Sequence, residues 1–203
     1  MGGMSNEKTK AVSPSKLAIL DAAEELFVER GYRDTTVVDI AALAGMSPAN
    51  LYRHFANKED IAAGFCTRRL AKRHQAMREV LERKRMSAAA RLEEFIVALL
   101  RYTYEETQNT PKTTQTVEVV LASRPEVVHD MLSDIQSMIA EILAQGNAQK
   151  EFAVENVMAT AETVFAAIVP YYTPLFMHLY PLPEFERRAR AIAALLVQGL
   201  ARR

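Results

Sequence analysis

A short segment in the first third of the chain carries side chains that can read the edges of DNA bases. Asn50 can pair with adenine, Arg53 can bind guanine or a phosphate, and Ala49 can touch a thymine methyl group. Leu51 and Phe55, four residues apart, are expected to anchor the inner face of the same helix. The predicted DNA-binding residues of this segment, which face outward, are Ser47, Pro48, Ala49, Asn50, Tyr52, Arg53 and His54.

Phosphate-binding chemistry flanks this segment on both sides. Thr36, Tyr52 and Lys58 offer hydroxyl and ammonium donors where phosphates would pass. Lys58 also lies in the first turn of a predicted helix, whose free N–H groups favour an anion. Surface Arg, Asn and Lys residues usually only solvate a helix. The prediction therefore depends on the spacing of the whole segment rather than on any one residue.

Two short helices joined by a tight turn are predicted to position these side chains. Thr36, followed three residues later by Asp39, has the pattern of a capped helix start. Gly45 ends that helix, because glycine accepts the positive φ that such a turn needs. Ser47 and Pro48 then begin a second helix, which gives a helix-turn-helix arrangement. The apolar residues expected to pack inward from the first helix are Val38, Ile40 and Leu43.

The remainder of the chain is predicted to be helical nearly throughout. Apolar residues recur at helical spacing, no segment alternates with period two, and no internal repeat is present. The fold class is therefore all-α with about nine helices. The expected division is a flexible N-terminal arm over 1–12, a three-helix helix-turn-helix domain over 13–60, and a larger helical domain over 61–203. The last helices are expected over about 125–145, 152–169 and 184–200.

Charge is distributed unevenly along the chain. The 25 basic and 25 acidic residues cancel overall. Residues 1–85, however, hold 15 Lys and Arg against 11 Asp and Glu, and residues 86–203 hold 10 against 14. A basic first part on an acidic remainder favours a polyanionic partner for the first part.

Neither a membrane segment nor an enzyme is predicted. The uncharged stretch 163–183 contains four prolines, whose freed backbone groups lipid cannot satisfy. The chain starts without the apolar core of a signal peptide, so a cytoplasmic protein without membrane contact is expected. The single cysteine, Cys66, excludes a disulfide scaffold, and the four histidines lack metal-ligand spacing. We expect no catalytic residue, no metal and no cofactor.

A resemblance to a known family covers about residues 14–65. The motifs that carry it are Ile19–Phe27, Gly31-Tyr32, Thr35–Val37, Asp39–Ala41, Ala44–Ser47, Leu51–Phe55 and Asn57–Glu59. They resemble the tetracycline-repressor (TetR) family. This implies a dimeric bacterial transcription regulator, usually a repressor that a small-molecule effector releases from a pseudo-palindromic operator in double-stranded DNA.

The same resemblance assigns roles to individual positions. Thr36, Tyr52 and Lys58 match phosphate contacts, and the outer face of residues 47–54 matches the recognition helix. The run Ser47–Asn50 is a local variant, because other members often carry Gly or Thr there. These positions face the bases, so the variation bears on which operator is read.

Beyond residue 65 the resemblance concerns architecture. It implies that a long linking helix leads to a variable domain with an effector pocket, and that the last two helices pair with those of a second subunit. The residues predicted to line the pocket are Phe95, Leu99, Tyr102, Met131, Met138, Phe165 and Tyr171. The residues predicted at the homodimer interface are Phe185, Ala189, Ile192, Ala193, Leu196 and Leu200. An alternative for the latter stripe is that it covers the chain's own core.

Two other functions stay open at this point. One is a helical protein–protein interaction module that does not bind DNA. One face of the segment argues against this module, because a chain that had lost DNA binding would be free to become acidic there. That face carries Asn50, Tyr52, Arg53 and Lys58. The other is a DNA-binding regulator, including an activator, that has no small-molecule effector.

Overall fold

The computed structural model describes residues 13–201, so the predicted arm over 1–12 lies outside the described residues. Over the described range the chain forms nine α-helices and two short 3₁₀ turns, with no named strand, which confirms the all-α prediction. The helices are α1 (Pro14–Glu29), α2 (Val37–Leu43), α3 (Pro48–Tyr52), α4 (Lys58–Leu81), α5 (Ala88–Asn109), α6 (Thr114–Ser123), α7 (Pro125–Ala148), α8 (Val157–Tyr172) and α9 (Leu182–Leu200).

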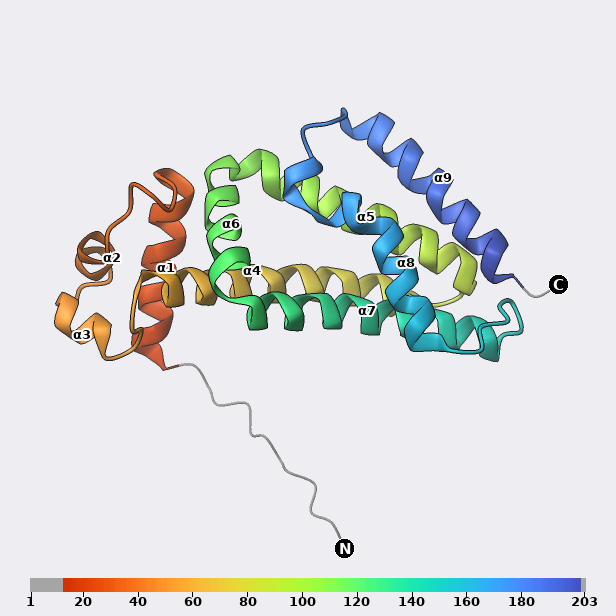
Figure 1. Cartoon of the computed structure of the whole chain (residues 1–203), viewed down its shortest axis with the longest axis horizontal. Coiled ribbons are helices and arrows are strands. Elements are labelled where there is room, and N and C mark those ends of the chain that lie inside the picture. The colour runs from red at the N-terminus through yellow and green to blue at the C-terminus, as the bar shows by residue number, and fades with distance from the viewer. Residues whose placement is uncertain (1–12, 202–203) are drawn as a thin grey trace, which may run out of the picture.

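The molecule is elongated, with α1, α2 and α3 gathered at one end (Figure 1). We call these three helices, with the first turns of α4, the head. Helix α4 leads away from the head, α5 returns, and α6 packs on α4 before α7 leads away again (Figure 1). Helix α7 packs on α8, and α9 packs on α5 at the outer side. The helices after the head form the body.

Side-chain caps begin most of these helices where the sequence offers a hydroxyl or an amide. Ser13, Asn57 and Ser87 each accept a hydrogen bond from the backbone N–H three residues later. Such a cap satisfies one of the N–H groups that the first helical turn leaves without a partner. The starts of α1, α4 and α5 are therefore determined by local sequence.

Helix α8 begins five residues later than the spacing predicted. Phe152 lies outside the helix and is 3% exposed, and its ring covers Gly146 so closely that a Cβ there would lie 2.1 Å from it. Asn156 then caps α8 by accepting the N–H of Ala159 at 3.1 Å. Phe152 thus fills the core from the connection between α7 and α8. The spacing of apolar residues alone cannot distinguish such a buried loop residue from a buried residue of a helix.

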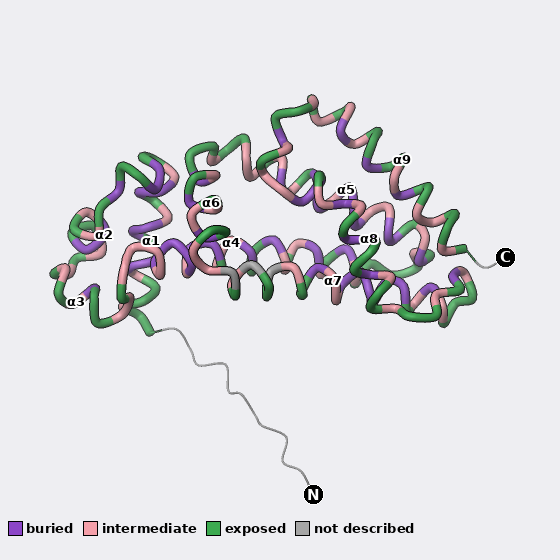
Figure 2. Tube along the Cα trace, in the orientation of Figure 1, coloured by how far each residue is buried: buried purple, intermediate pink, exposed green. Residues whose placement is uncertain are grey.

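Two separate clusters of buried side chains form the core (Figure 2). The head cluster joins α1, α2 and α3 to the first turns of α4 through residues such as Phe27, Leu51 and Phe65, each 0% exposed. The body cluster joins the rest of α4 to α5, α7, α8 and α9. Helix α4 belongs to both clusters, and the domain division at residue 60 stays a prediction.

The expected packing of α2 is correct for one residue and wrong for two. Ile40 is 0% exposed, but Val38 is 61% exposed and Leu43 is 47% exposed. A seven-residue helix buries one narrow face, and here that face is made by Ile40 and Ala41. Val38 and Leu43 point to solvent from the other sides.

No helix within the described residues is long and apolar enough to cross a membrane.

Candidate nucleic-acid interface and cavity

Gly45 ends α2 in a left-handed turn. Its φ is +68°, and the N–H groups of Gly45 and Met46 donate to the carbonyls of Ala42 and Ala41 at 3.1 and 2.9 Å. This is the hydrogen-bond pattern of a Schellman motif. No atom lies within 4 Å of the place a Cβ would occupy, so the backbone conformation, not lack of space, calls for glycine.

Helix α3 follows at once and presents two contrasting faces. Ser47 caps it, because its Oγ accepts the N–H of Asn50 at 3.2 Å. Leu51 is 0% exposed and anchors α3 to the head cluster, while Tyr52 is 52% exposed on the outside. Arg53, at the C-cap, is exposed as well. The short helix is thereby held by one apolar residue and leaves its polar side chains accessible.

The start of α2 is fixed by a reciprocal capping box. The Thr36 hydroxyl donates to Asp39 Oδ2 at 2.6 Å and accepts the N–H of Asp39 at 3.1 Å. In return, Asp39 Oδ2 accepts the N–H of Thr36 at 2.9 Å. These hydrogen bonds from Thr36 hold the pKa of Asp39 below its usual value. Thr36 is exposed, so it combines a structural role with a position at the surface.

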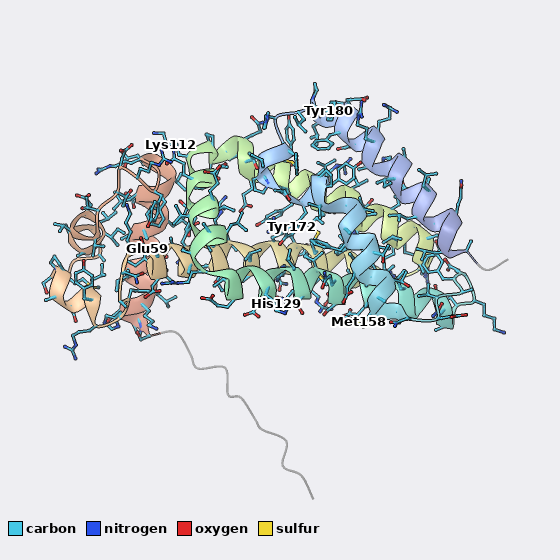
Figure 3. All side chains as sticks on the ribbon, in the orientation of Figure 1. Glu59, Lys112, His129, Met158, Tyr172 and Tyr180 are labelled. Atoms are coloured by element: carbon cyan, nitrogen blue, oxygen red, sulfur yellow. The ribbon has the colours of Figure 1, made fainter. Side chains whose placement is uncertain are left out.

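Lys58 lies at the first position of α4, half-buried against an aromatic ring. Its Nζ is 4.1 Å from the centroid of Tyr32, and burial lowers the pKa of Lys58. The Tyr32 hydroxyl donates to Glu59 at 3.1 Å. Burial and this hydrogen bond raise the pKa of Tyr32 to about 12. Figure 3 labels Glu59 in the first turn of α4, within the head.

The nine residues predicted to bind DNA lie together at the end of the molecule. They occupy the N-cap of α2, helix α3 with its two caps and the residue after it, and the start of α4. Their contact with DNA stays a prediction.

A cavity of about 320 Å³ lies in the body, next to the head. Five helices contribute to its wall: α4, α5, α6, α7 and α8. Its lining residues are Cys66, Arg69, Leu70, Arg73, Glu106, Val117, Val120, Leu121, Leu132, Phe165, Val169, Tyr172, Thr173 and Pro174. The volume is at the lower end of the range of roughly 300–1,000 Å³ for small-molecule sites.

Three charged side chains line this otherwise largely apolar wall. Arg69 forms an ion pair with Glu106 at 2.9 Å, and a second bond joins Arg69 Nη2 to Thr110 Oγ1 at 2.8 Å. Arg73 is 6% exposed and lies with its guanidinium carbon 4.2 Å from the centre of the Tyr172 ring. Burial raises the pKa of the Cys66 thiol to about 12, so this cysteine stays protonated at neutral pH.

Family models match both parts of the chain. The model for bacterial regulatory proteins of the tetR family matches residues 19–64, which cover most of the head. The model for the tetracyclin repressor-like C-terminal domain matches residues 88–193, more than half of the chain. The chain belongs to the TetR family. It is therefore a transcription regulator with a helix-turn-helix DNA-binding domain, as the sequence motifs predicted.

Individual relatives agree with this assignment. The HTH-type transcriptional repressor BepR of Brucella suis is 29% identical over 177 residues, which cover 84% of this chain and 85% of that protein. A crystal structure described as a TetR-family transcriptional regulator from Mesorhizobium loti has a TM-score of 0.74 at 17% identity, covering 93% of this chain and 97% of that one. FadR of Bacillus subtilis, crystallised in complex with stearoyl-CoA, has a TM-score of 0.64 at 21% identity, covering 91% and 98%.

Of the residues predicted to line the pocket of this TetR-family protein, Phe165 lines the cavity. Phe95 and Leu99 are 0% exposed and Met138 is 3% exposed, all within the body cluster. Tyr171 packs edge-on against Phe185 with ring centroids 5.3 Å apart. Tyr102 is half-buried against the body cluster and is not among the lining residues, and the side chain of Met131 lies outside the described part of the structure.

The lining residues that the sequence prediction missed lie mainly on α4 and α6. One feature could have revealed them: Arg73 interrupts an apolar stripe of α4 made by Cys66, Leu70, Met77 and Val80. A charged residue at a buried position of such a stripe is uncommon unless it is paired. The sequence prediction rests on aromatic and Met residues instead, and of its residues Phe95, Leu99 and Met138 lie in the body cluster.

The predicted interface stripe of α9 also divides into two groups. Phe185, Ala189 and Ala193 are buried in the chain's own body cluster, where α9 packs on α5. Ile192, Leu196 and Leu200 are half-buried against the same cluster. The opposite face of α9 exposes Leu195 to 63%. The contact of α9 with a second subunit stays a prediction.

Within residues 13–201 no group of three or more His, Cys, Asp or Glu side chains is arranged to hold a metal ion.

Proposed function

We propose that this TetR-family regulator is a homodimeric repressor, acting in the cytoplasm, whose two α3 helices bind a pseudo-palindromic operator. A small molecule that enters the cavity releases it from that DNA. The observation that carries the proposal is a shared wall: Val120 is 2% exposed, belongs to the head cluster and also lines the cavity. A ligand in the cavity would thus touch a residue on which the head packs.

Helix α6 gives this shared wall a path to the DNA-binding end. Val117 also lines the cavity and packs against the head cluster. At the N-terminal side of α6, Lys112 donates from Nζ to the carbonyl of Glu29, the last residue of α1, at 2.5 Å. At its C-terminal side, Arg124 forms an ion pair with Asp60 in the first turn of α4. Figure 3 shows Lys112 at the end of α6 that faces α1.

These contacts connect α6 to both helices that hold the head. If the ligand displaces α6, the ends of α1 and α4 move with it, and the spacing of the two α3 helices in a dimer changes. A ligand shifts such an equilibrium only by its difference in affinity for the two states, typically about 1–3 kcal/mol.

Dimer formation is supported by the apolar residues exposed on the last two helices and the connection between them. Met158, Leu175, Leu179 and Leu195 are 49%, 54%, 50% and 63% exposed. We expect Leu195→Glu to produce monomers in sedimentation velocity, because a charge would be buried between subunits without a partner. The matched control is Leu17→Glu on α1, a residue 43% exposed, which should stay dimeric. A dimeric Leu195→Glu variant would contradict this interface.

The decisive test of the function is selection of bound fragments from random DNA duplexes with the purified protein, followed by binding at several salt concentrations. We expect a palindromic consensus bound with high affinity, since two α3 helices related by a two-fold axis read two similar half-sites. Weak binding without a consensus, falling uniformly with salt, would indicate phosphate attraction alone. That result would favour the interaction-module alternative.

A further inference from the structure

Two arginines in the body are almost fully buried, and their surroundings differ. Arg91 is 5% exposed, and its guanidinium donates to three backbone carbonyls at the end of α4, those of Val80 at 2.9 Å, Arg83 at 2.7 Å and Leu81. Carbonyls at a helix C-terminus lack intrahelical partners and carry partial negative charge, so a cation is stabilised there. The burial of Arg91 is thus explained by the fold itself.

Arg73 has no comparable compensation. It is 6% exposed, and its Nη1 makes one long hydrogen bond, 3.4 Å, to the carbonyl of Tyr172. Its Nε, like that of Arg91, is buried without a hydrogen-bond partner, and no carboxylate among the described residues lies within ion-pair distance of Arg73. The neighbouring acids are already engaged, Glu106 with Arg69 and Asp134 with His74. Stacking on the Tyr172 ring offsets only part of the cost of burying the charge.

The unpaired charge borders the cavity, together with a second unpaired polar group. Arg73 and Tyr172 both line it, and the Tyr172 hydroxyl is also buried without a hydrogen-bond partner. Burial raises the pKa of Tyr172, so the hydroxyl stays protonated at neutral pH and can donate. Figure 3 shows Tyr172 in the interior between α8 and α4. The charged lining residues, Arg69, Arg73 and Glu106, leave the wall with one net positive charge.

Burying a cation without a partner costs free energy. An anion in the cavity would supply the partner that the fold lacks. We propose that the cavity binds a compact monocarboxylic acid, with its carboxylate on Arg73 and its apolar body among Leu70, Val120, Leu132 and Val169. This assignment names the class of effector and so rests on the proposed function. A carboxylate suits the guanidinium because it accepts charge-assisted hydrogen bonds. The cavity volume of about 320 Å³ limits the ligand to compact molecules.

The test compares matched acids and alcohols in the absence of DNA. Octanoate is paired with octan-1-ol, and 4-phenylbutyrate with 4-phenylbutan-1-ol, and binding to the full chain is measured by titration calorimetry. We expect at least one acid to bind about ten- to a hundredfold more tightly than its alcohol, as a charge-assisted hydrogen bond implies. Arg73→Met should abolish this preference and Arg73→Lys should retain part of it. Equal binding of acid and alcohol, or binding of neither pair, would overturn the proposal.

Thermal unfolding of the ligand-free variants separates a ligand-binding role from a structural one. Arg73→Met should melt at the same temperature as the parent protein or higher, because it removes an unpaired buried charge. Arg91→Met is the matched control. It should melt lower, because the last carbonyls of α4 lose their donors, while the preference for acids persists. A lowered melting temperature for Arg73→Met, or a preference for acids that survives in it, would overturn the role of Arg73.

The outcome is independent of the proposed release from DNA. If the acids bind through Arg73 but leave operator affinity unchanged, the site stands and effector release fails. If operator binding is found but acids and alcohols bind alike, the regulator stands and the carboxylate assignment fails.

Discussion

The head and the cavity wall both contain polar groups that need hydrogen-bond partners, but they provide those partners differently. In the head, the capping partners are close in sequence: Thr36 and Asp39 cap each other, and Ser47 caps α3 through Asn50. At the cavity wall, Arg73 and Tyr172 approach from helices about 100 residues apart and still leave buried polar atoms without partners. The head is complete without a ligand, whereas the wall is not.

This difference matches what each region would do under the proposed function. A DNA-reading surface has to keep its side chains in one fixed geometry before it meets DNA, and local caps and a closed core provide that. An effector site gains affinity when its polar groups find partners only in the bound ligand. Arg73, which makes one long hydrogen bond, is therefore informative, while Arg91, whose guanidinium donates to three carbonyls, is not.

The largest expected effect compares the packing of the two regions. Leu51→Ala should lower the free energy of unfolding by about 2–5 kcal/mol, because Leu51 is 0% exposed in the head cluster. Leu132→Ala should cost less, because Leu132 is half-buried and part of its surface already faces the cavity. Urea denaturation of both variants measures the difference. Equal losses would mean that the cavity wall is packed as tightly as the head.

The next effect tests whether the head alone reads DNA. Arg53→Ala should weaken binding to the selected operator by about 1–3 kcal/mol if Arg53 contacts a base, with the melting temperature unchanged since the side chain is exposed. Lys84→Ala, an exposed cation beyond the far end of α4, is the matched control and should bind as the parent protein does. Fluorescence anisotropy with labelled operator measures both. Unchanged affinity of Arg53→Ala would remove it from the contact surface.

The smallest effect concerns the local caps. Thr36→Ala should lower the free energy of unfolding by about 1 kcal/mol, because α2 loses its capping hydroxyl. Thr36→Ser keeps a hydroxyl and should stay close to the parent protein. Chemical denaturation measures the loss, and the cavity should bind its ligands as before in calorimetry. A change in ligand affinity would show that the two regions are coupled more tightly than their separate cores suggest.

Much of the head could be predicted from sequence because its determinants are local. The caps at Thr36 and Ser47 and the turn at Gly45 lie where the sequence motifs predicted them. The inward packing of Val38 and Leu43 could not, because which face of so short a helix is buried depends on the neighbours it meets.

The sequence by itself determined that the chain is helical, where most helices begin, and which side chains of α3 can face DNA. These follow from hydrogen bonds between residues three or four positions apart. Only the tertiary structure decided that Phe95 and Leu99 fill the core, that α9 buries Phe185 against α5, and that Arg73 borders a cavity. A cavity is the space that five helices leave between them, and no spacing along one helix specifies the shape of that space.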